Sequence, residues 1–211
     1  MIAGERERGG LVAGESAVVR SIAPAQPGGR DPAPGQLALV QSFINSHYDL
    51  EHEHGGELLA TPDALSAWLS ARGLIARADL GSRDLRRVVA LREALRTLAC
   101  ANTGAHRPDL AALNEAAIGA AVEIRFHRVG PQFVPTGRGD LDSAIGVLLA
   151  IVAAAMFDGS WSRLKVCPGQ HCGWAFYDNS RNQSGRWCSM SVCGGRAKAR
   201  AHYRRRRAGP E

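Results

Sequence analysis

Four of the five cysteines in this 211-residue chain lie close together near its C-terminal end: Cys167, Cys172, Cys188 and Cys193. Their pattern is C-x4-C-x15-C-x4-C, two short pairs separated by a longer loop. Each pair can present two thiolates from a tight turn, and the loop allows the pairs to meet around one tetrahedral ion. The pattern therefore predicts one structural zinc ion (Zn2+) per chain, with no coordination position open to water.

Other roles for these cysteines stay open. They could form disulfides or be unrelated buried thiols, but the sequence shows no secretory signal, and we expect a cytoplasmic protein whose thiols stay reduced. His171 adjoins Cys172 and could replace it as a ligand. The fifth cysteine, Cys100, lies in an apolar helical pattern and is expected in the core.

Basic residues are concentrated beside the cysteines. The chain carries a net charge of +6, which divides into −3 for residues 1–160 and +9 for residues 161–211. If residues 191–206 form a helix, Arg196, Arg200, Arg204 and Arg207 share one face, and such a stripe is suited to phosphate contacts with duplex DNA. The candidate DNA-binding residues are Arg181, Arg186, Arg196, Lys198, Arg200, Arg204, Arg205 and Arg207. The alternative is a solvated basic tail, part of which balances the negative charge of a four-thiolate zinc site.

The cysteine-rich segment resembles the CGNR zinc finger, a module of bacterial proteins described as transcription regulators. Three tracts carry the resemblance: F-Y-D-x-S at 176–180, R-W-C-S-M at 186–190, and C-G-x-R-x-K-x-R at 193–200. The resemblance implies zinc bound by the four cysteines and a module that binds DNA. Two positions depart from it: Gly195 stands where the family has the Asn of its name, and Gly185 where it often has Arg.

The segments before the finger predict a helical domain. Residues 1–35 are rich in Gly, Ala, Pro and charge, and we expect a disordered or loosely attached tail. Helices are expected over residues 36–46, 62–72, 83–103 and 109–118 and within residues 140–158, with Thr61 and Ser82 as the N-caps of the second and third. Alternation over residues 122–128 predicts a strand, paired with residues 132–135. The apolar run within residues 140–158 is too short to span a membrane and is expected to be the buried central helix.

Residues 36–75 resemble the start of the ABATE domain, the usual N-terminal partner of the CGNR finger. The matching words are F-I-N-S at 43–46 and L-L-A-T-P-D-x-L-x-x-W-L at 58–69. The resemblance implies a domain that senses a small-molecule ligand, without identifying the ligand's contacts. The charged side of residues 83–103, with Arg86, Arg87, Arg92 and Arg96, is expected to be solvated, the alternative being an arginine that binds an anionic ligand. His47, His52 and His54 are expected in a polar loop, the alternative being a second metal site.

No catalytic motif is present, so we do not expect an enzyme. The predicted class is mainly α with one small β-hairpin (α+β), divided into a tail (1–35), a helical ABATE-like domain (36–160) and a zinc finger with a basic C-terminal helix (161–207). The predicted function is a zinc-dependent, DNA-binding transcription regulator. The alternatives are an adaptor that binds an acidic protein and a zinc-thiolate redox sensor. Trp174, Phe176 and Trp187 are expected to form the small core of the finger, the alternative being stacking on unpaired bases.

Overall fold

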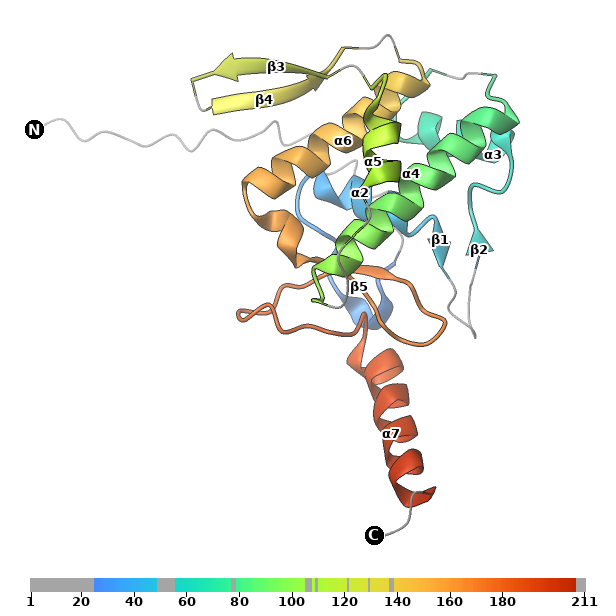
Figure 1. Ribbon diagram of the computed structural model, residues 1–211, viewed down its shortest axis with the longest axis vertical. Helices are drawn as coiled ribbons and strands as arrows, with labels where there is room; N and C mark the ends of the chain where they lie inside the picture. The colour runs from blue at the N-terminus through green and yellow to red at the C-terminus, as the bar shows by residue number, and fades with distance from the viewer. Residues whose placement is uncertain are drawn as a thin grey trace, which may run out of the picture.

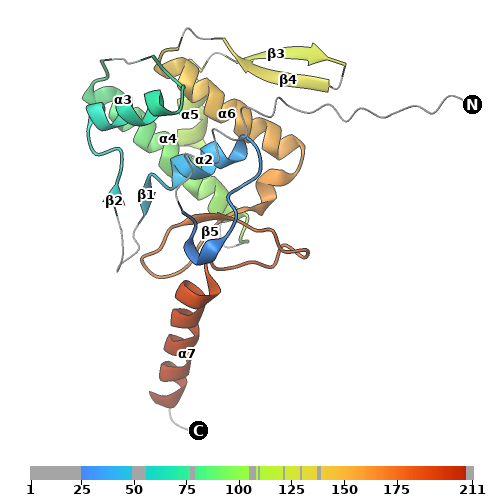
Figure 2. The same cartoon turned by 180° about the vertical axis from the view of Figure 1, so that it is seen from behind.

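The computed structural model describes residues 25–48, 56–76, 79–104, 108, 110–120, 122–128, 130–136 and 139–207. In this part of the chain, five α-helices form the body of the molecule, and a sixth, α7 (Gly195–Arg207), extends away from it (Figures 1 and 2). The helices of the body are α2 (Leu37–Ile44), α3 (Pro62–Ala71), α4 (Ser82–Ala101), α5 (Ala111–Ala117) and α6 (Leu141–Phe157). All five agree with the expected helices to within a few residues at each end.

Local sequence signals explain where the helices begin. The Thr61 hydroxyl accepts a hydrogen bond from the Ala64 amide, and Pro62 occupies the first helical position, as predicted. The Asp140 carboxylate accepts from the Ser143 amide at the start of α6. The start of α4 differs from the prediction: Ser82 is already helical and Gly81 precedes it, because the Asp84 carboxylate accepts the Gly81 amide at 2.9 Å.

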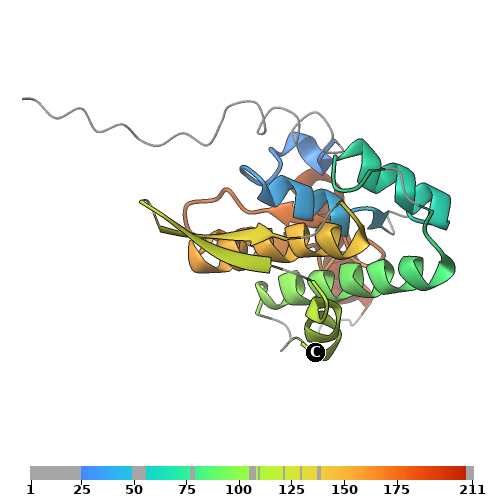
Figure 3. The same ribbon diagram turned by 90° about the horizontal axis from the view of Figure 1, so that it is seen from above.

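The core lies where α2, α4 and α6 meet. Phe43 of α2, Leu95 of α4, and Ile145 and Leu148 of α6 are at most 1% exposed. Helices α2 and α5 each pack against both α4 and α6, and they lie on opposite sides of them in the view from above (Figure 3). The prediction that the apolar run within residues 140–158 forms a buried central helix is therefore confirmed. Among the described residues, no helix is long and apolar enough to cross a membrane.

Among the described residues, three antiparallel strand pairs accompany the helices, where one was expected. The expected pair is β3 (Val122–His127) with β4 (Gly130–Pro135). The others are β1 (His47–Tyr48) with β2 (Gly56–Glu57) and β5 (Leu164–Val166) with β6 (Ala175–Tyr177). They are only two or three residues long, too short for a pattern of alternation to reveal. The mixed α+β class is as predicted.

The β5–β6 hairpin carries the first cysteine pair, and it packs into the main core. Leu164 and Ala175 are fully buried in the same apolar cluster as α2, α4 and α6. The Asn45 side chain forms two hydrogen bonds with the backbone of Ala175, accepting its amide at 2.7 Å and donating to its carbonyl at 2.8 Å. The Asn102 amide group donates to the carbonyls of Trp161 and Leu164. The base of the finger is thus held by side chains of the helical domain.

Residues 25–35 are not the loosely attached segment expected for the stretch 1–35. Ala33 is 2% exposed, and its amide donates to the Gln41 side chain at 2.7 Å. The side chain of Gln26 accepts hydrogen bonds from Gln41 and from the Trp174 indole. The Gly- and Pro-rich composition does not predict this packing. The stretch is held by hydrogen bonds to distant residues and not by a long helix or strand of its own. The other part of the expected tail, residues 1–24, lies outside the described residues.

Candidate metal centre and nucleic-acid interface

The four cysteines of the C-terminal segment converge in one buried cluster. Their sulfur atoms all lie within 4.8 Å of one another, and the Sγ atom of Cys188 is 3.6 Å from those of Cys172 and Cys193. A tetrahedral zinc ion with Zn–S bonds of about 2.3 Å requires sulfur atoms about 3.8 Å apart. A disulfide requires two sulfur atoms about 2.05 Å apart. The four sulfurs therefore fit a metal ion, and none of the four residues forms a disulfide.

The proton equilibria of these thiols also favour a divalent cation. Hydrogen bonds from the thiols of Cys172 and Cys188 lower the pKa of Cys167 to about 2. The hydrogen bond with Cys167 raises the pKa of Cys172 to about 12. Hydrogen bonds with Cys167 and Cys172 also raise the pKa of Cys188. Without a cation, the burial and close approach of the thiols oppose the formation of several thiolates at once. A bound metal ion supplies the positive charge that stabilises all four thiolates.

Two turns present the four sulfur atoms. The first follows β5, and its Gly169 packs directly on the sulfurs: a Cβ at this position would lie 3.1 Å from Cys193 Sγ and 3.4 Å from Cys167 Sγ. The second is a short π-helical turn, η3 (Met190–Gly194), which contains Cys193 and leads directly into α7. The position of the basic helix is therefore tied to the metal site through its first residues.

A buried ion pair, Lys165–Asp178, organises the loop between the two cysteine pairs. Lys165 Nζ lies 2.8 Å from Asp178 Oδ2, with side chains 7% and 0% exposed. The Asp178 carboxylate also accepts the amides of Ser180 and Gly185, while Lys165 Nζ donates to the carbonyls of Gln183 and Gly185. Burial alone would raise the pKa of Asp178, but these hydrogen bonds outweigh it and lower the pKa to about 2. The ion pair therefore holds residues 178–180 of the loop close to Gln183 and Gly185.

The Asp178 carboxylate also explains why residue 185 is a glycine. A Cβ at this position would lie 2.6 Å from Asp178 Oδ1, so a side chain here requires the carboxylate to move. Gly195 is different, because its Cβ would meet only the Met190 carbonyl at 3.6 Å. The helix start can therefore accommodate the Asn found at this position in the CGNR motif.

The N-terminal stretch supports the second cysteine pair. Arg30 donates to the carbonyls of Cys188 and Trp187 at 2.7 and 3.1 Å, and its guanidinium lies 5.1 Å from the centre of the Phe176 ring. Gly28 has a φ of +71°, and a Cβ there would lie 2.7 Å from Ser189 Oγ. Residues about 160 positions before the cysteines thus complete the surroundings of the metal site.

The aromatic residues of the finger divide into two groups. Trp174 and Phe176 are 3% and 1% exposed and form a small core with the four cysteines, as predicted, and Tyr48 packs edge-on against Trp174 at 4.9 Å. Trp187 differs, because it is only partly buried at the edge of this core, and the Arg186 guanidinium lies 5.3 Å from its ring centre.

The candidate DNA-binding residues lie on two exposed segments. Arg181 and Arg186 are in the loop organised by Lys165 and Asp178, and the others are on α7, which has no buried residue. Helix α7 carries seven Lys and Arg residues and no acidic one. With 100° between successive residues, Arg196, Arg200, Arg204 and Arg207 share one face with Tyr203, and Lys198 and Arg205 lie elsewhere on the helix. We call this face the basic stripe.

Two of the arginines expected on the solvated side of residues 83–103 are not solvated. Arg92 is 2% exposed and donates to both carboxylate oxygens of Glu57, at 2.6 and 2.7 Å. Arg96 donates to the carbonyls of Ile44, His47 and Gly173, the last of which lies between the cysteine pairs. Arg86 is exposed as predicted, and Arg87 is half-buried and paired with Asp142. A helical pattern cannot distinguish these cases, because the partners come from other elements.

Three residues that hold the site in place were not recognised as such from the sequence. Asn45 and Asp178 lie within the quoted words F-I-N-S and F-Y-D-x-S, and an Asp two residues before a Ser is a typical Asx-turn signal. Arg30 carried no recognisable signal. Of the three loop histidines, His52 and His54 lie outside the described residues, among which the four cysteines are the one cluster suited to a metal ion.

The fold and the site together define a zinc-finger protein with a helical N-terminal domain. Residues 163–206 match the model of the CGNR zinc finger. Residues 37–159 match the model of the ABATE family, described as "Putative stress-induced transcription regulator", and the chain belongs to this family. No curated protein matches the chain.

Proposed function

We propose that the protein is a transcription regulator that binds one zinc ion per chain through Cys167, Cys172, Cys188 and Cys193, and duplex DNA through the basic stripe. It acts by binding and not as an enzyme. The observation that carries the proposal is the connection of η3 to α7: the turn that holds Cys193 leads directly into a helix with seven basic residues and no acidic one. A metal ion at the cysteines then fixes the start of the helix, and phosphate contacts by its arginines release counterions from DNA.

Residues near the two ends of α7 should contribute differently. Arg196 is one residue into the helix, close to the metal-bound turn, and its side chain is the best placed for a base-edge contact, which is worth about 1–3 kcal/mol of discrimination. Arg204 and Arg207 lie in the last turn, far from that anchor. They should contact phosphates and contribute equally on every sequence.

The test is a salt titration of the zinc-loaded protein on a selected and a random duplex. We expect affinity to fall steeply with salt, with a log–log slope reduced by about one when Arg204 is replaced by Ala. Arg205→Ala is the matched control, because it removes the same charge from outside the stripe. Arg196→Ala should weaken the selected site more than the random one. Binding of neither duplex at low salt would favour the adaptor function, and equal loss from Arg204→Ala and Arg205→Ala would indicate a polyanion-binding tail.

Zinc is tested separately. Elemental analysis of freshly purified protein should give one zinc ion per chain, and Cys188→Ser should remove it. A redox sensor would instead release zinc on mild oxidation and lose DNA binding until a thiol is added.

We also propose that the N-terminal domain senses a small molecule and passes the signal to the finger through Arg96. Its guanidinium links the end of α2 and the first residue of β1 to Gly173 in the finger, so a ligand that moves these elements displaces the turn between the cysteine pairs. Compounds that raise the melting temperature should also change the affinity for DNA. In Arg96→Ala the compound should still bind, but its effect on DNA binding should be lost.

A further inference from the structure

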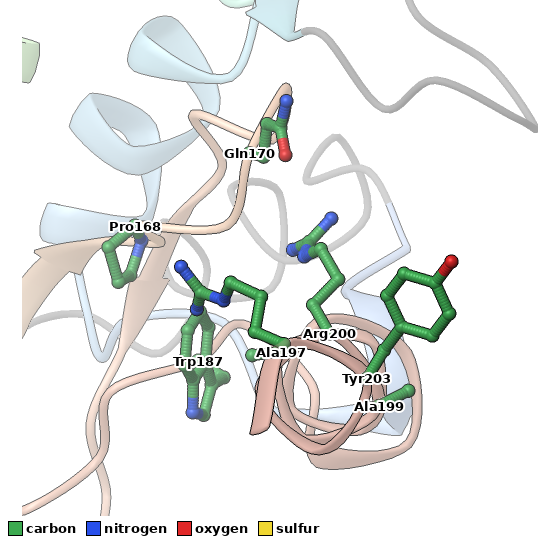
Figure 4. A pocket seen from close by; sticks show the side chains of 8 residues that line it. Pro168, Gln170, Trp187, Ala197, Ala199, Arg200 and Tyr203 are labelled. Carbon is green, nitrogen blue, oxygen red and sulfur yellow. The ribbon is translucent and has the colours of Figure 1, made fainter. Parts of the chain in front are cut away.

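The basic stripe forms one wall of a cleft in the finger. The opposite wall is the first cysteine turn, with Pro168 and Gln170, and Trp187 lies at one side. Arg200 projects from α7 toward this turn, with Trp187 on one side and Tyr203 on the other (Figure 4). The cleft has a volume of about 710 Å³, within the range of about 300–1,000 Å³ typical of small-molecule sites.

The lining combines two kinds of surface. Trp187, Pro168, Ala197, Ala199 and Tyr203 provide an apolar interior with two aromatic rings. Arg200 and Arg204 provide the charge, and no acidic residue lines the cleft. A positive groove with aromatic side chains is what proteins use to bind unpaired strands, where bases stack on the rings and the cations follow the phosphates. The Arg186 guanidinium beside Trp187 adds a cation outside the cleft.

A base within a duplex cannot reach this interior, because both of its faces are stacked on neighbouring base pairs. A base that is unpaired and turned out of the helix presents a flat apolar face and carries phosphates on both sides. The charge of the cleft complements those phosphates, and its apolar wall complements the base. Phosphate contacts alone need only the arginines and would leave the apolar wall exposed to water.

We propose that this cleft accepts one unpaired nucleobase of a DNA strand. Trp187 stacks on the base, and Arg200 and Arg204 bind the phosphates that flank it. The inference rests on the proposed function, since it assumes that the finger binds DNA. It adds that the finger prefers a duplex containing an extruded or bulged base to a perfect duplex.

The experiment compares three probes of the same sequence: a perfect 20-base-pair duplex, the duplex with one additional unpaired thymine, and the duplex with an abasic nucleotide at the same place. Stacking on an aromatic side chain is worth about 1–3 kcal/mol per base. The full-length, zinc-loaded protein should therefore bind the thymine bulge about 5–150 times more tightly than the perfect duplex. The abasic probe has the same phosphates and the same bend without the base, and should bind like the perfect duplex.

Two variants test the cleft itself. Trp187→Leu removes the ring, and Ala197→Leu fills the cleft while leaving every charge in place. Both should lose the preference for the bulge and keep the affinity for the perfect duplex. Arg205→Ala, whose side chain lies outside the stripe and does not line the cleft, should bind all three probes about as the wild type does and keep the preference. If Trp187→Leu loses zinc or has a lower melting temperature, the Ala197→Leu variant alone tests whether the cleft binds the base.

The outcomes separate this inference from the proposed function. Equal binding of the thymine bulge and the perfect duplex would overturn the inference and leave duplex binding intact. Equal binding of the thymine and abasic bulges, both above the perfect duplex, would mean that the finger recognises a bent backbone, and would also overturn it. Failure to bind any of the three would remove the proposed function itself.

Discussion

Replacing Asp178 by Asn is the most direct test of how the site is held together. The substitution keeps the shape of the side chain and removes its charge. It leaves the ammonium of Lys165, which is 7% exposed, without its buried counterion. An Asn oxygen can still accept one backbone amide, but its NH2 group then faces the donors of Lys165 and Gly185.

The size of the effect follows from burial. Removing one partner of a buried ion pair costs about 3–5 kcal/mol, because the remaining charge is uncompensated. In a protein of this length, 1 kcal/mol corresponds to about 2–4 °C in melting temperature. We therefore expect Asp178→Asn to lower the melting temperature by about 6–20 °C. Because the pair fixes the loop that leads to Cys188, zinc affinity should fall about 10–100-fold, as for other groups that orient metal ligands.

The assay is thermal denaturation followed by circular dichroism, with zinc affinity measured by competition with a chromogenic chelator. Glu123→Gln is the matched control: it removes one carboxylate from an ion pair with Arg125 whose side chains are 56% and 60% exposed. Such a surface pair contributes at most about 1 kcal/mol. The double variant Lys165→Met/Asp178→Asn removes both buried charges and should recover much of the loss. It should not recover all of it, because the carbonyls of Gln183 and Gly185 lose their donor.

The pair also predicts a pH dependence. The pKa of Asp178 is lowered from 3.8 to about 2, so the folded protein holds this carboxylate ionised where the unfolded chain protonates it. Its contribution to stability is complete above about pH 5 and is lost progressively as the pH falls through 3.8 and then below about 2. The difference between wild type and Asp178→Asn should therefore shrink over this range. The reasoning would be refuted if Asp178→Asn behaved like Glu123→Gln at pH 7, or if the difference grew in acid.

Three further substitutions test the contacts around the finger. Arg30→Ala removes two hydrogen bonds to the second cysteine turn and should cost about 1–3 kcal/mol, measured as a lower melting temperature and faster zinc release, while Arg30→Lys should restore only part. Asn45→Ala leaves the buried amide and carbonyl of Ala175 with fewer partners and should cost about 1–3 kcal/mol for each group left unpaired; a variant that melts like wild type would show that the finger does not depend on this contact. Gly195→Ala should stabilise α7 by about 0.5–1 kcal/mol, seen as more helical circular dichroism, because the position is helical, exposed and open to a Cβ.

Local patterns were sufficient for the parts of the protein that depend on neighbours in the chain. The cysteine spacing indicated a metal site because each pair closes within one short turn. The stripe on α7 followed from helical periodicity, and the capping signal at Thr61 placed the start of α3. The same holds for α6, whose length and apolar composition distinguish a buried helix from a membrane span.

Tertiary structure decided everything that joins distant residues. Arg30 reaches a carbonyl 158 positions away, and Asn45 binds a strand 130 positions away. Neither contact leaves a period or a spacing in the sequence. The burial of Arg92 and the partial burial of Arg96 depend on Glu57 and on carbonyls of other elements, so helical position alone placed them wrongly. The cleft beside α7 likewise exists because the two cysteine turns bring Pro168, Trp187 and Arg200 together, and only the folded chain places these three residues along one cleft.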